Sequence, residues 1–149
     1  MIEIREATEK DSAIILDCIC GLAMHVNQLD MVTVTEQAIR ESFFKPGSHV
    51  NVFVAEKGDA ICGYALIFKT FSTFKAITNY HIEDLFIFPE YRNCGIGKKF
   101  LDYIKGYAKD HGATKVEWYV NNANQGAIDF YKKDGAKVLD YKSINQLEI

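Results

Sequence analysis

The sequence predicts an α/β fold in which helices flank one mixed β-sheet. Segments with the two-residue alternation of strands are interleaved with segments that have the 3.6-residue periodicity of helices. The 149 residues are 48% hydrophobic, which is enough for one core, and no linker, repeat or low-complexity stretch interrupts them. We therefore expect a single domain that spans residues 1–149.

The N-terminal part of the chain predicts one strand and two helices. Residues 2–6 alternate as a strand, and Thr8 with Asp11 three residues later forms a variant of the capping box that starts a helix. Residues 33–36 have capping-box spacing and predict a second helix, which ends near Phe44 before the breaker at residues 45–48. The first helix buries its periodic apolar side chains: Ile14, Ile15, Cys18 and Leu22.

The rest of the chain predicts further strands and two more helices. Residues 50–55 and 61–71 read as an antiparallel pair around the turn at 57–59, and residues 80–88 as a fourth strand stopped by Pro89. A helix follows over 95–110, then a strand over 115–120 and a short helix over 124–133, with Asn124 as its cap and Gly135 at its end. The tail, residues 136–149, has room for two short strands.

Composition excludes several classes of partner. A net charge of -3 gives no electrostatic reason to expect nucleic acid or an anionic membrane, and no apolar run is long enough to span a bilayer. The N-terminus lacks the features of a signal peptide, so we expect a cytoplasmic protein. Cys18 and Cys20 are too close together for a Cys-x-x-Cys motif, and no metal site is predicted.

The most informative stretch lies between the fourth strand and the helix after it. Residues 92–97 place Arg92 before Gly95 and Gly97 in an Arg-x-x-Gly-x-Gly turn. Glycines let backbone N–H groups approach a phosphate, and a helix N-terminus adds roughly half a positive charge. A dinucleotide fingerprint would need a small residue where Phe100 stands, and a P-loop would need Ser or Thr where Lys99 stands. A glycine turn that merely starts a helix is the remaining structural alternative.

Together with its surroundings, this turn resembles the GNAT superfamily of N-acetyltransferases, and within it the diamine (spermidine/spermine-type) acetyltransferases. The similarity rests on residues 82–97, on residues 117–120 and on the Asn-x-x-Ala-Ile-x-Phe-Tyr pattern of residues 124–131. The resemblance implies a mostly antiparallel sheet with splayed central strands, acetyl-coenzyme A (acetyl-CoA) as co-substrate, and a homodimer. It also implies the residues that bind the coenzyme: Leu85, Phe86 and Ile87 along the pantetheine, Arg92, Asn93, Cys94, Gly95, Ile96, Gly97 and Lys98 at the pyrophosphate, and Asn124 and Ala127 on the far side.

Two further residues match catalytic positions of that family. Glu83 matches the carboxylate that helps to remove the proton of the amine, a need that arises because an alkylammonium has a pKa of about 10.4. Tyr131 matches the tyrosine aimed at the coenzyme sulfur. A phenol has a pKa of about 10, above that of a thiol. Tyr131 is therefore better suited to donate a hydrogen bond to the thiolate than to give up its proton. Strand alternation predicts that Glu83 shares a face with His81 and Leu85, while Asp84 shares the opposite face with Ile82 and Phe86.

The substrate end departs from the family. Acidic residues are expected after the first helix, but Val26 stands there beside His25. Substrate contacts are predicted at His25, Val26, Glu83, Trp118 and Tyr119. The leading hypothesis is an N-acetyltransferase for a primary amine of a small molecule, such as a polyamine, a diamine or an amino acid. The alternatives are an acetyltransferase for a peptide or an aminoglycoside, and a coenzyme A-binding sensor that has lost catalysis.

Overall fold

The computed structural model describes residues 1–149, which divide into two compact units, Met1–Tyr119 and Val120–Ile149. The first unit contains a five-stranded sheet with the strand order β1-β2-β3-β4-β5. Neighbours from β1 to β4 are antiparallel, and β5 is parallel to β4. The predicted mixed, mostly antiparallel sheet is therefore confirmed. Its strands are β1 (Ile2–Glu6), β2 (Val50–Lys57), β3 (Ala60–Ser72), β4 (Ile77–Ile87) and β5 (Val116–Trp118).

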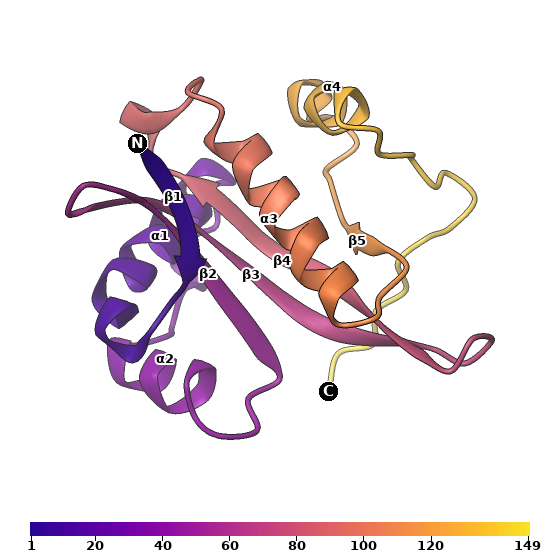
Figure 1. Cartoon of the computed structure of the whole chain (residues 1–149), viewed down its shortest axis with the longest axis horizontal. Helices are drawn as coiled ribbons and strands as arrows, with labels where there is room; N and C mark the ends of the chain where they lie inside the picture. Colours follow the sequence, from indigo (N-terminus) through magenta and orange to yellow (C-terminus); the bar gives the residue numbers. More distant parts are fainter. The chain divides into compact units, whose positions relative to one another are not determined.

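Helices cover both faces of this sheet (Figure 1). Helices α1 (Ser12–His25) and α2 (Glu36–Phe43) pack on one face, and α3 (Ile96–Asp110) packs on the other. Phe53 of β2 meets Tyr103 and Tyr107 of α3 edge-on, with ring centroids 5.1 Å apart in both pairs. The core on the α1 and α2 face is formed by Ile15, Cys18, Ile39, Val52, Val54, Tyr64, Leu66 and Phe86.

The helix starts follow the capping signals, with one shift. The Asp11 carboxylate accepts the backbone N–H of Thr8 at 2.7 Å and two N–H groups of Arg5, so a 3₁₀ turn (Glu9–Asp11) precedes α1. Helix α2 is capped by Thr35 and not by Thr33. The Oγ1 of Thr35 accepts the Ala38 N–H at 3.1 Å. Thr35 is the residue with extended backbone directly before the first helical turn, which is the position that a cap requires.

The second half of β4 departs from regular pairing. Leu66 of β3 lies opposite Asp84, and the next residue, Ile67, lies opposite Ile82. Glu83 is therefore an extra residue, a β-bulge. On its other side β4 pairs with β5 only over three residues, from Tyr80 to Ile82. Beyond the bulge, that edge of β4 has no strand partner, which agrees with the splayed central strands that the family resemblance implies.

The second unit contains one helix, α4 (Gln125–Lys133). Its cap is Asn124, whose Oδ1 accepts the Ala127 N–H at 3.1 Å, as the sequence predicts. The two strands expected in the tail are absent, since residues 136–149 adopt neither strand nor helix. An alternating pattern forms a strand only where a neighbouring edge pairs with it.

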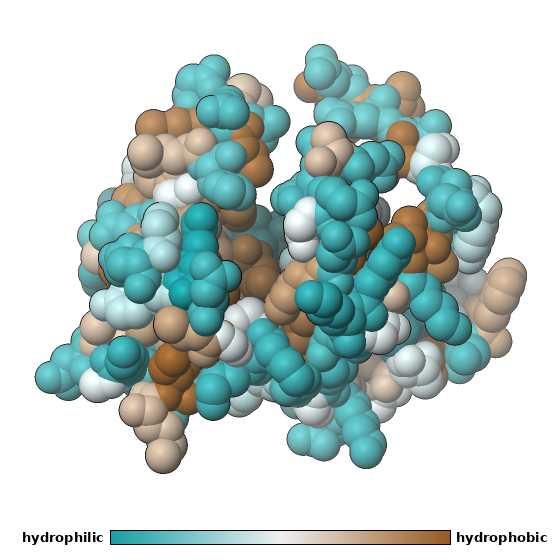
Figure 2. Space-filling model, turned by 90° about the horizontal axis from the view of Figure 1, so that it is seen from above, coloured by the Kyte–Doolittle hydropathy of each residue, from teal (hydrophilic) through white to brown (hydrophobic).

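Figure 2 shows hydrophilic side chains over most of the visible face, with hydrophobic ones gathered in smaller patches between them. None of the helices combines the length and the apolar character needed to cross a bilayer.

Candidate active site

The turn between β4 and α3 leaves backbone donors exposed at a helix N-terminus. Gly95, the cap residue, has a φ of 78°, and Asn93 has a φ of 60°, so both adopt the left-handed conformation. No side chain caps α3, and its first backbone hydrogen bond runs from the Lys99 N–H to the Gly95 carbonyl at 3.1 Å. The first N–H groups of an α-helix have no partner within the helix, so the start of α3 offers backbone donors that suit an anion.

The side chains around this turn mostly hold it in place. The Nε of Arg92 donates to the carbonyl of Ile87 at 2.9 Å, and its guanidinium lies 5.6 Å from the ring centre of Phe86. Ile96 is buried, whereas Cys94 is exposed. The Lys98 amine contacts both carboxylate oxygens of Asp102 at 3.1 Å. The turn is therefore tied back to β4 by Arg92 and anchored in the core by Ile96.

The edge of β4 that leads to this turn is open on one side. Leu85, Phe86 and Ile87 pair with β3 through their inner edge, while β5 ends before it reaches them. Backbone N–H and C=O groups on such an edge can pair with an extended chain that carries amides. The pantetheine arm of coenzyme A is a chain of this kind, so the open edge and the uncapped helix end both fit the coenzyme.

The bulge overturns the predicted division of faces. Leu66 and Phe86 belong to the core on the α1 and α2 face, and Asp84 lies opposite Leu66. Asp84 therefore shares the face of Phe86 but not that of Ile82, which pairs with Ile67. The Glu83 carboxylate lies 3.9 Å from the His81 ring, on the same side of the sheet as Asp84. The prediction that the two carboxylates lie on opposite faces was wrong, because the extra residue breaks the strand alternation.

A cleft of about 620 Å³ lies beside Glu83. Its wall contains apolar side chains of β2 and β3, among them Val50, Leu66 and Phe68, and the loop before β2 completes it. We call this cavity the Glu83 cleft. A carboxylate on an apolar wall suits an amine that carries a hydrocarbon chain.

His81 is the buried neighbour of Glu83. It is 6% exposed and lies between the ring of Phe68, at 4.8 Å, and the ring of Tyr119, at 4.6 Å. Burial lowers the pKa of His81 below its ordinary value, against the opposing effect of the Glu83 and Glu117 carboxylates. The imidazole is thus neutral at neutral pH and can accept a proton. Its position two residues before Glu83 was the available signal.

Asp84 has a different partner. The hydroxyl of the fully buried Tyr64 donates a hydrogen bond to its Oδ2. Burial raises the pKa of Asp84; the hydrogen bond from Tyr64 opposes the rise, and the charge of Glu83 adds to it. Asp84 thus lies underneath the site, bonded to a core tyrosine.

The other predicted substrate residues are spread over the first unit. His25 ends α1 and Val26 caps it, and both side chains are exposed. Tyr119 contacts His81 and is 70% exposed, so it lies at the site. Trp118 pairs with Ile82, which puts it on the α3 face, opposite to His81.

Tyr131 belongs to the second unit. It lies on α4 against Phe130, with ring centroids 5.2 Å apart. Burial raises the pKa of Tyr131, so its phenol keeps its proton at neutral pH and remains a hydrogen-bond donor. Asn124 and Ala127 contact each other at the start of the same helix.

Comparison with known proteins identifies the family. The model of the acetyltransferase (GNAT) family matches residues 24–136. The chain belongs to this family. It is 34% identical over 146 residues to the thialysine N-epsilon-acetyltransferase of Bos taurus, covering 93% of this chain and 85% of the relative. It is 37% identical over 78 residues to the L-ornithine N5-acetyltransferase of Arabidopsis thaliana, covering 52% of this chain and 34% of that protein.

A solved structure supports the fold of this GNAT acetyltransferase. An integron cassette protein of Vibrio cholerae superimposes with a TM-score of 0.84 at 22% identity, covering 99% of this chain and 92% of the other. The predicted superfamily, the similarity to diamine acetyltransferases and the assignment as an enzyme are confirmed. GNAT enzymes use acetyl-CoA as co-substrate, so this family member is an acetyl-CoA-dependent N-acetyltransferase.

The Tyr64–Asp84 hydrogen bond predicts a measurable change of acidity. In the Tyr64→Phe variant the carboxylate loses a donor that stabilises its charged form, so the pKa of Asp84 should rise above its value in the wild type. Titration of the Asp84 carboxyl carbon by NMR measures this directly. Tyr103→Phe, which removes a hydroxyl on the α3 face, is the matched control and should leave the titration unchanged. An Asp84 pKa that stays constant or falls in Tyr64→Phe contradicts the assigned hydrogen bond.

Proposed function

We propose that this protein transfers the acetyl group of acetyl-CoA to a primary amine at the end of a small molecule, by direct attack of the amine on the thioester. The observation that carries the proposal is the Glu83 carboxylate on the β4 bulge, which lies where the open strand edge begins and beside a cleft. Residues 1–149 act as one N-acetyltransferase domain in this proposal. Release of coenzyme A thiol with a panel of amines tests it, and a panel that yields no thiol contradicts it.

The donor is held by backbone rather than by charged side chains. Leu85, Phe86 and Ile87 pair with the pantetheine, and the N–H groups of residues 96–98 take the pyrophosphate at the positive end of α3. The bound coenzyme supplies an acetyl thioester, an acyl group already activated towards amines. Arg92 helps by fixing the turn through Ile87. Asn124 and Ala127 contact the coenzyme from α4.

The amine must lose a proton before it reacts. At neutral pH only about one alkylamine in a thousand is neutral, because its pKa is near 10.4. Glu83 attracts the ammonium and takes its proton, directly or through water. Neutral His81, with its Nε2 3.9 Å from the Glu83 carboxylate, offers the proton a second position. Tyr131 donates a hydrogen bond to the sulfur as negative charge develops on it.

The acceptor is a short amine in this proposal. The relatives with full-length similarity are named for acetylating thialysine, and a partial match for acetylating ornithine. Both are amino acids with an amine at the end of the side chain. The Glu83 cleft has an apolar wall on which such a chain can lie. Of the other residues predicted to contact the substrate, Tyr119 lies against His81, whereas Trp118 lies on the opposite face of the sheet. His25 and Val26 remain predicted contacts at the end of α1.

The coenzyme site predicts the effect of a single glycine substitution. Gly97→Val places a branched side chain at the second residue of α3, where the phosphate must approach the backbone, so acetyl-CoA binding should fall by at least about tenfold. Isothermal calorimetry measures the affinity. Gly106→Val is the control, because it lies on the same helix and a Cβ there meets no atom within 4 Å. Equal affinity of Gly97→Val and the wild type contradicts the assignment.

The two catalytic residues should differ in their pH dependence. Glu83→Gln should lower kcat/KM most at low pH and recover in part as the pH approaches the amine pKa of about 10, where the amine loses its proton unaided. Tyr131→Phe should lower kcat by about 10²-fold at every pH, as expected for one lost donor to developing charge, with little change in acetyl-CoA affinity. A pH-independent loss in Glu83→Gln, together with near-full kcat in Tyr131→Phe, contradicts both roles.

We also propose a homodimer. Large apolar side chains are exposed on each unit, namely Phe74 in the β3–β4 hairpin of the first and Tyr141, Ile144 and Leu147 in the tail of the second. A second copy could cover them. Sedimentation at micromolar concentration should give twice the monomer mass of 16.9 kDa. A single species of monomer mass contradicts the proposal.

A further inference from the structure

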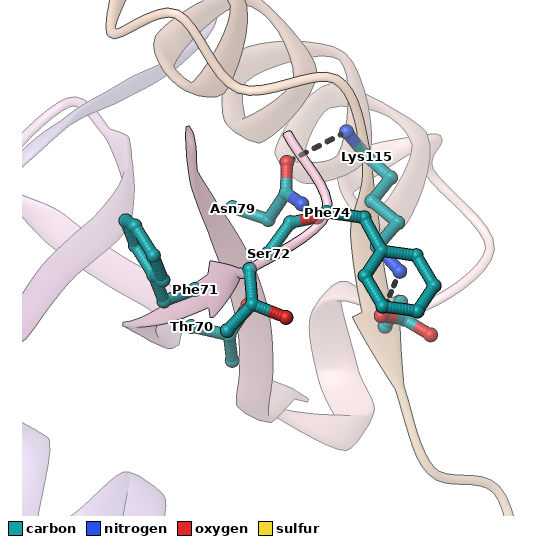
Figure 3. Close-up of a pocket in the computed structure, with 8 residues that line it drawn as sticks. Thr70, Phe71, Ser72, Phe74, Asn79 and Lys115 are labelled. Carbon is teal, nitrogen blue, oxygen red and sulfur yellow. Dashed lines mark hydrogen bonds and ion pairs between the residues drawn. The ribbon is translucent and has the colours of Figure 1, made fainter. Parts of the chain in front are cut away.

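A second cavity lies at the far end of the same sheet. It has a volume of about 270 Å³ and is formed by the end of the β3–β4 hairpin and by β5 (Figure 3). We call it the hairpin cavity. Its lining combines hydroxyl groups, two phenylalanines and one pair of opposite charges, from Thr70, Phe71, Ser72, Thr73, Phe74, Asn79, Lys115 and Glu117. None of these residues has a role in the mechanism above.

The charges in the hairpin cavity form an ion pair. Lys115 Nζ lies 2.9 Å from Glu117 Oε1, and the two side chains are 52% and 37% exposed. Both groups are thus accessible, and both keep capacity for further partners, because the ammonium has three donors and the carboxylate two acceptor oxygens.

The backbone below this pair is fixed. Asn79 is 2% exposed, and its Oδ1 accepts the N–H groups of Thr114 at 2.9 Å and of Lys115 at 3.3 Å. Figure 3 shows the Asn79 amide reaching the backbone of Lys115. The side chain of Lys115 pairs with Glu117. The ion pair is therefore presented by a rigid edge of the sheet.

The register connects this pair to the catalytic carboxylate. Glu117 is the partner of His81, so the two side chains leave the sheet on the same face, and Glu83 lies against the other side of His81. From strand spacing and rise, the Cα atoms of Glu117 and Glu83 are roughly 8 Å apart. An extended chain of four or five bonds covers about 5 to 6 Å, and a hydrogen bond of about 3 Å at each end extends its reach to about 11 to 12 Å. This reach suits two carboxylates that lie at the ends of their side chains, beyond the Cα atoms, with the Glu117 carboxylate held at Lys115.

We propose that the hairpin cavity binds the α-amino-acid head of the acceptor, and that the acceptor is an amino acid with a primary amine at the end of its side chain. The α-ammonium pairs with Glu117 and the α-carboxylate with Lys115, because those groups stand about one hydrogen-bond length apart, as do the two charges of an amino acid. The side chain crosses the His81 ring beside Phe68, which belongs to the apolar wall of the Glu83 cleft, and its amine reaches Glu83. This inference rests on the proposed function and names its substrate class.

The same pair disfavours a diamine. A second ammonium without a carboxylate would meet Glu117 but also the positive charge of Lys115, and the two effects oppose each other. Discrimination between an amino acid and the diamine of equal length therefore depends on Lys115, which attracts the first and repels the second.

The test compares lysine with cadaverine, which is lysine without its carboxylate, by release of coenzyme A thiol and by mass spectrometry of the product. The wild type should acetylate the side-chain amine of lysine with a kcat/KM at least about tenfold above that of cadaverine. The preference should reside in KM, because the head is remote from the reacting atoms.

Two variants separate recognition from a structural effect. Lys115→Met should lower kcat/KM for lysine about tenfold and raise it for cadaverine, since the repulsion disappears while Glu117 remains. Glu117→Gln should weaken the binding of both. Glu36→Gln, which breaks an exposed ion pair on α2, is the matched control and should change neither substrate. Melting temperatures show whether each variant is folded.

The outcomes distinguish this inference from the proposed function. If cadaverine is acetylated as efficiently as lysine, if Lys115→Met leaves their ratio unchanged, or if the α-amine of lysine is the acetylated group, the inference is wrong and the activity stands. If neither lysine nor cadaverine yields product while a longer polyamine does, the inference is also wrong and the activity stands. If no amine of a small molecule yields product, the proposed function fails and the inference fails with it.

Discussion

The site depends on one extra residue in β4. The sheet core requires that Leu66 and Phe86 face α1 and α2, while Ile67 and Ile82 face α3. Regular alternation cannot satisfy both demands, because Ile82 and Phe86 are four residues apart and would share a face. The bulge at Glu83 removes the conflict by shifting the register by one residue. The residue that absorbs the shift is released from the ladder and can turn its carboxylate to the cleft.

The bulge also sets the electrostatics of the face. Glu83 stays on the side of His81, as strand alternation predicts, and the bulge puts Asp84 on the same side of the sheet. Two carboxylates this close would repel each other if both were equally solvated. The fold gives the two carboxylates different environments instead. Asp84 is bonded to Tyr64 and its pKa is raised, while Glu83 stays at the surface of the cleft beside an imidazole that burial keeps neutral.

Most of the fold could be predicted because its signals are local. Thr8 and Asn124 mark helix starts through hydrogen bonds with residues three positions away, and Pro89 and Gly95 mark the turn before α3. The bulge left no such mark, since no glycine stands at Glu83, and the consecutive acidic residues Glu83 and Asp84 fit equally well a regular strand with one carboxylate on each face. The prediction of two strands in the tail was wrong for a related reason. An alternating segment becomes a strand only where a partner strand pairs with it, and the sequence does not identify that partner.

The coenzyme side and the acceptor side of the site also differ in how far the sequence predicts them. The turn that fits the coenzyme is built from consecutive residues, so the Arg-x-x-Gly-x-Gly pattern was enough to locate it. The acceptor side is built from β2, β3, β4 and β5, whose contributions meet only through sheet register. In the linear sequence, Lys115 and Glu117 are only two charged residues of a predicted strand. They become a recognition pair only because β5 runs parallel to β4 and stops at Trp118, which places Glu117 beside His81 and leaves the rest of the β4 edge open.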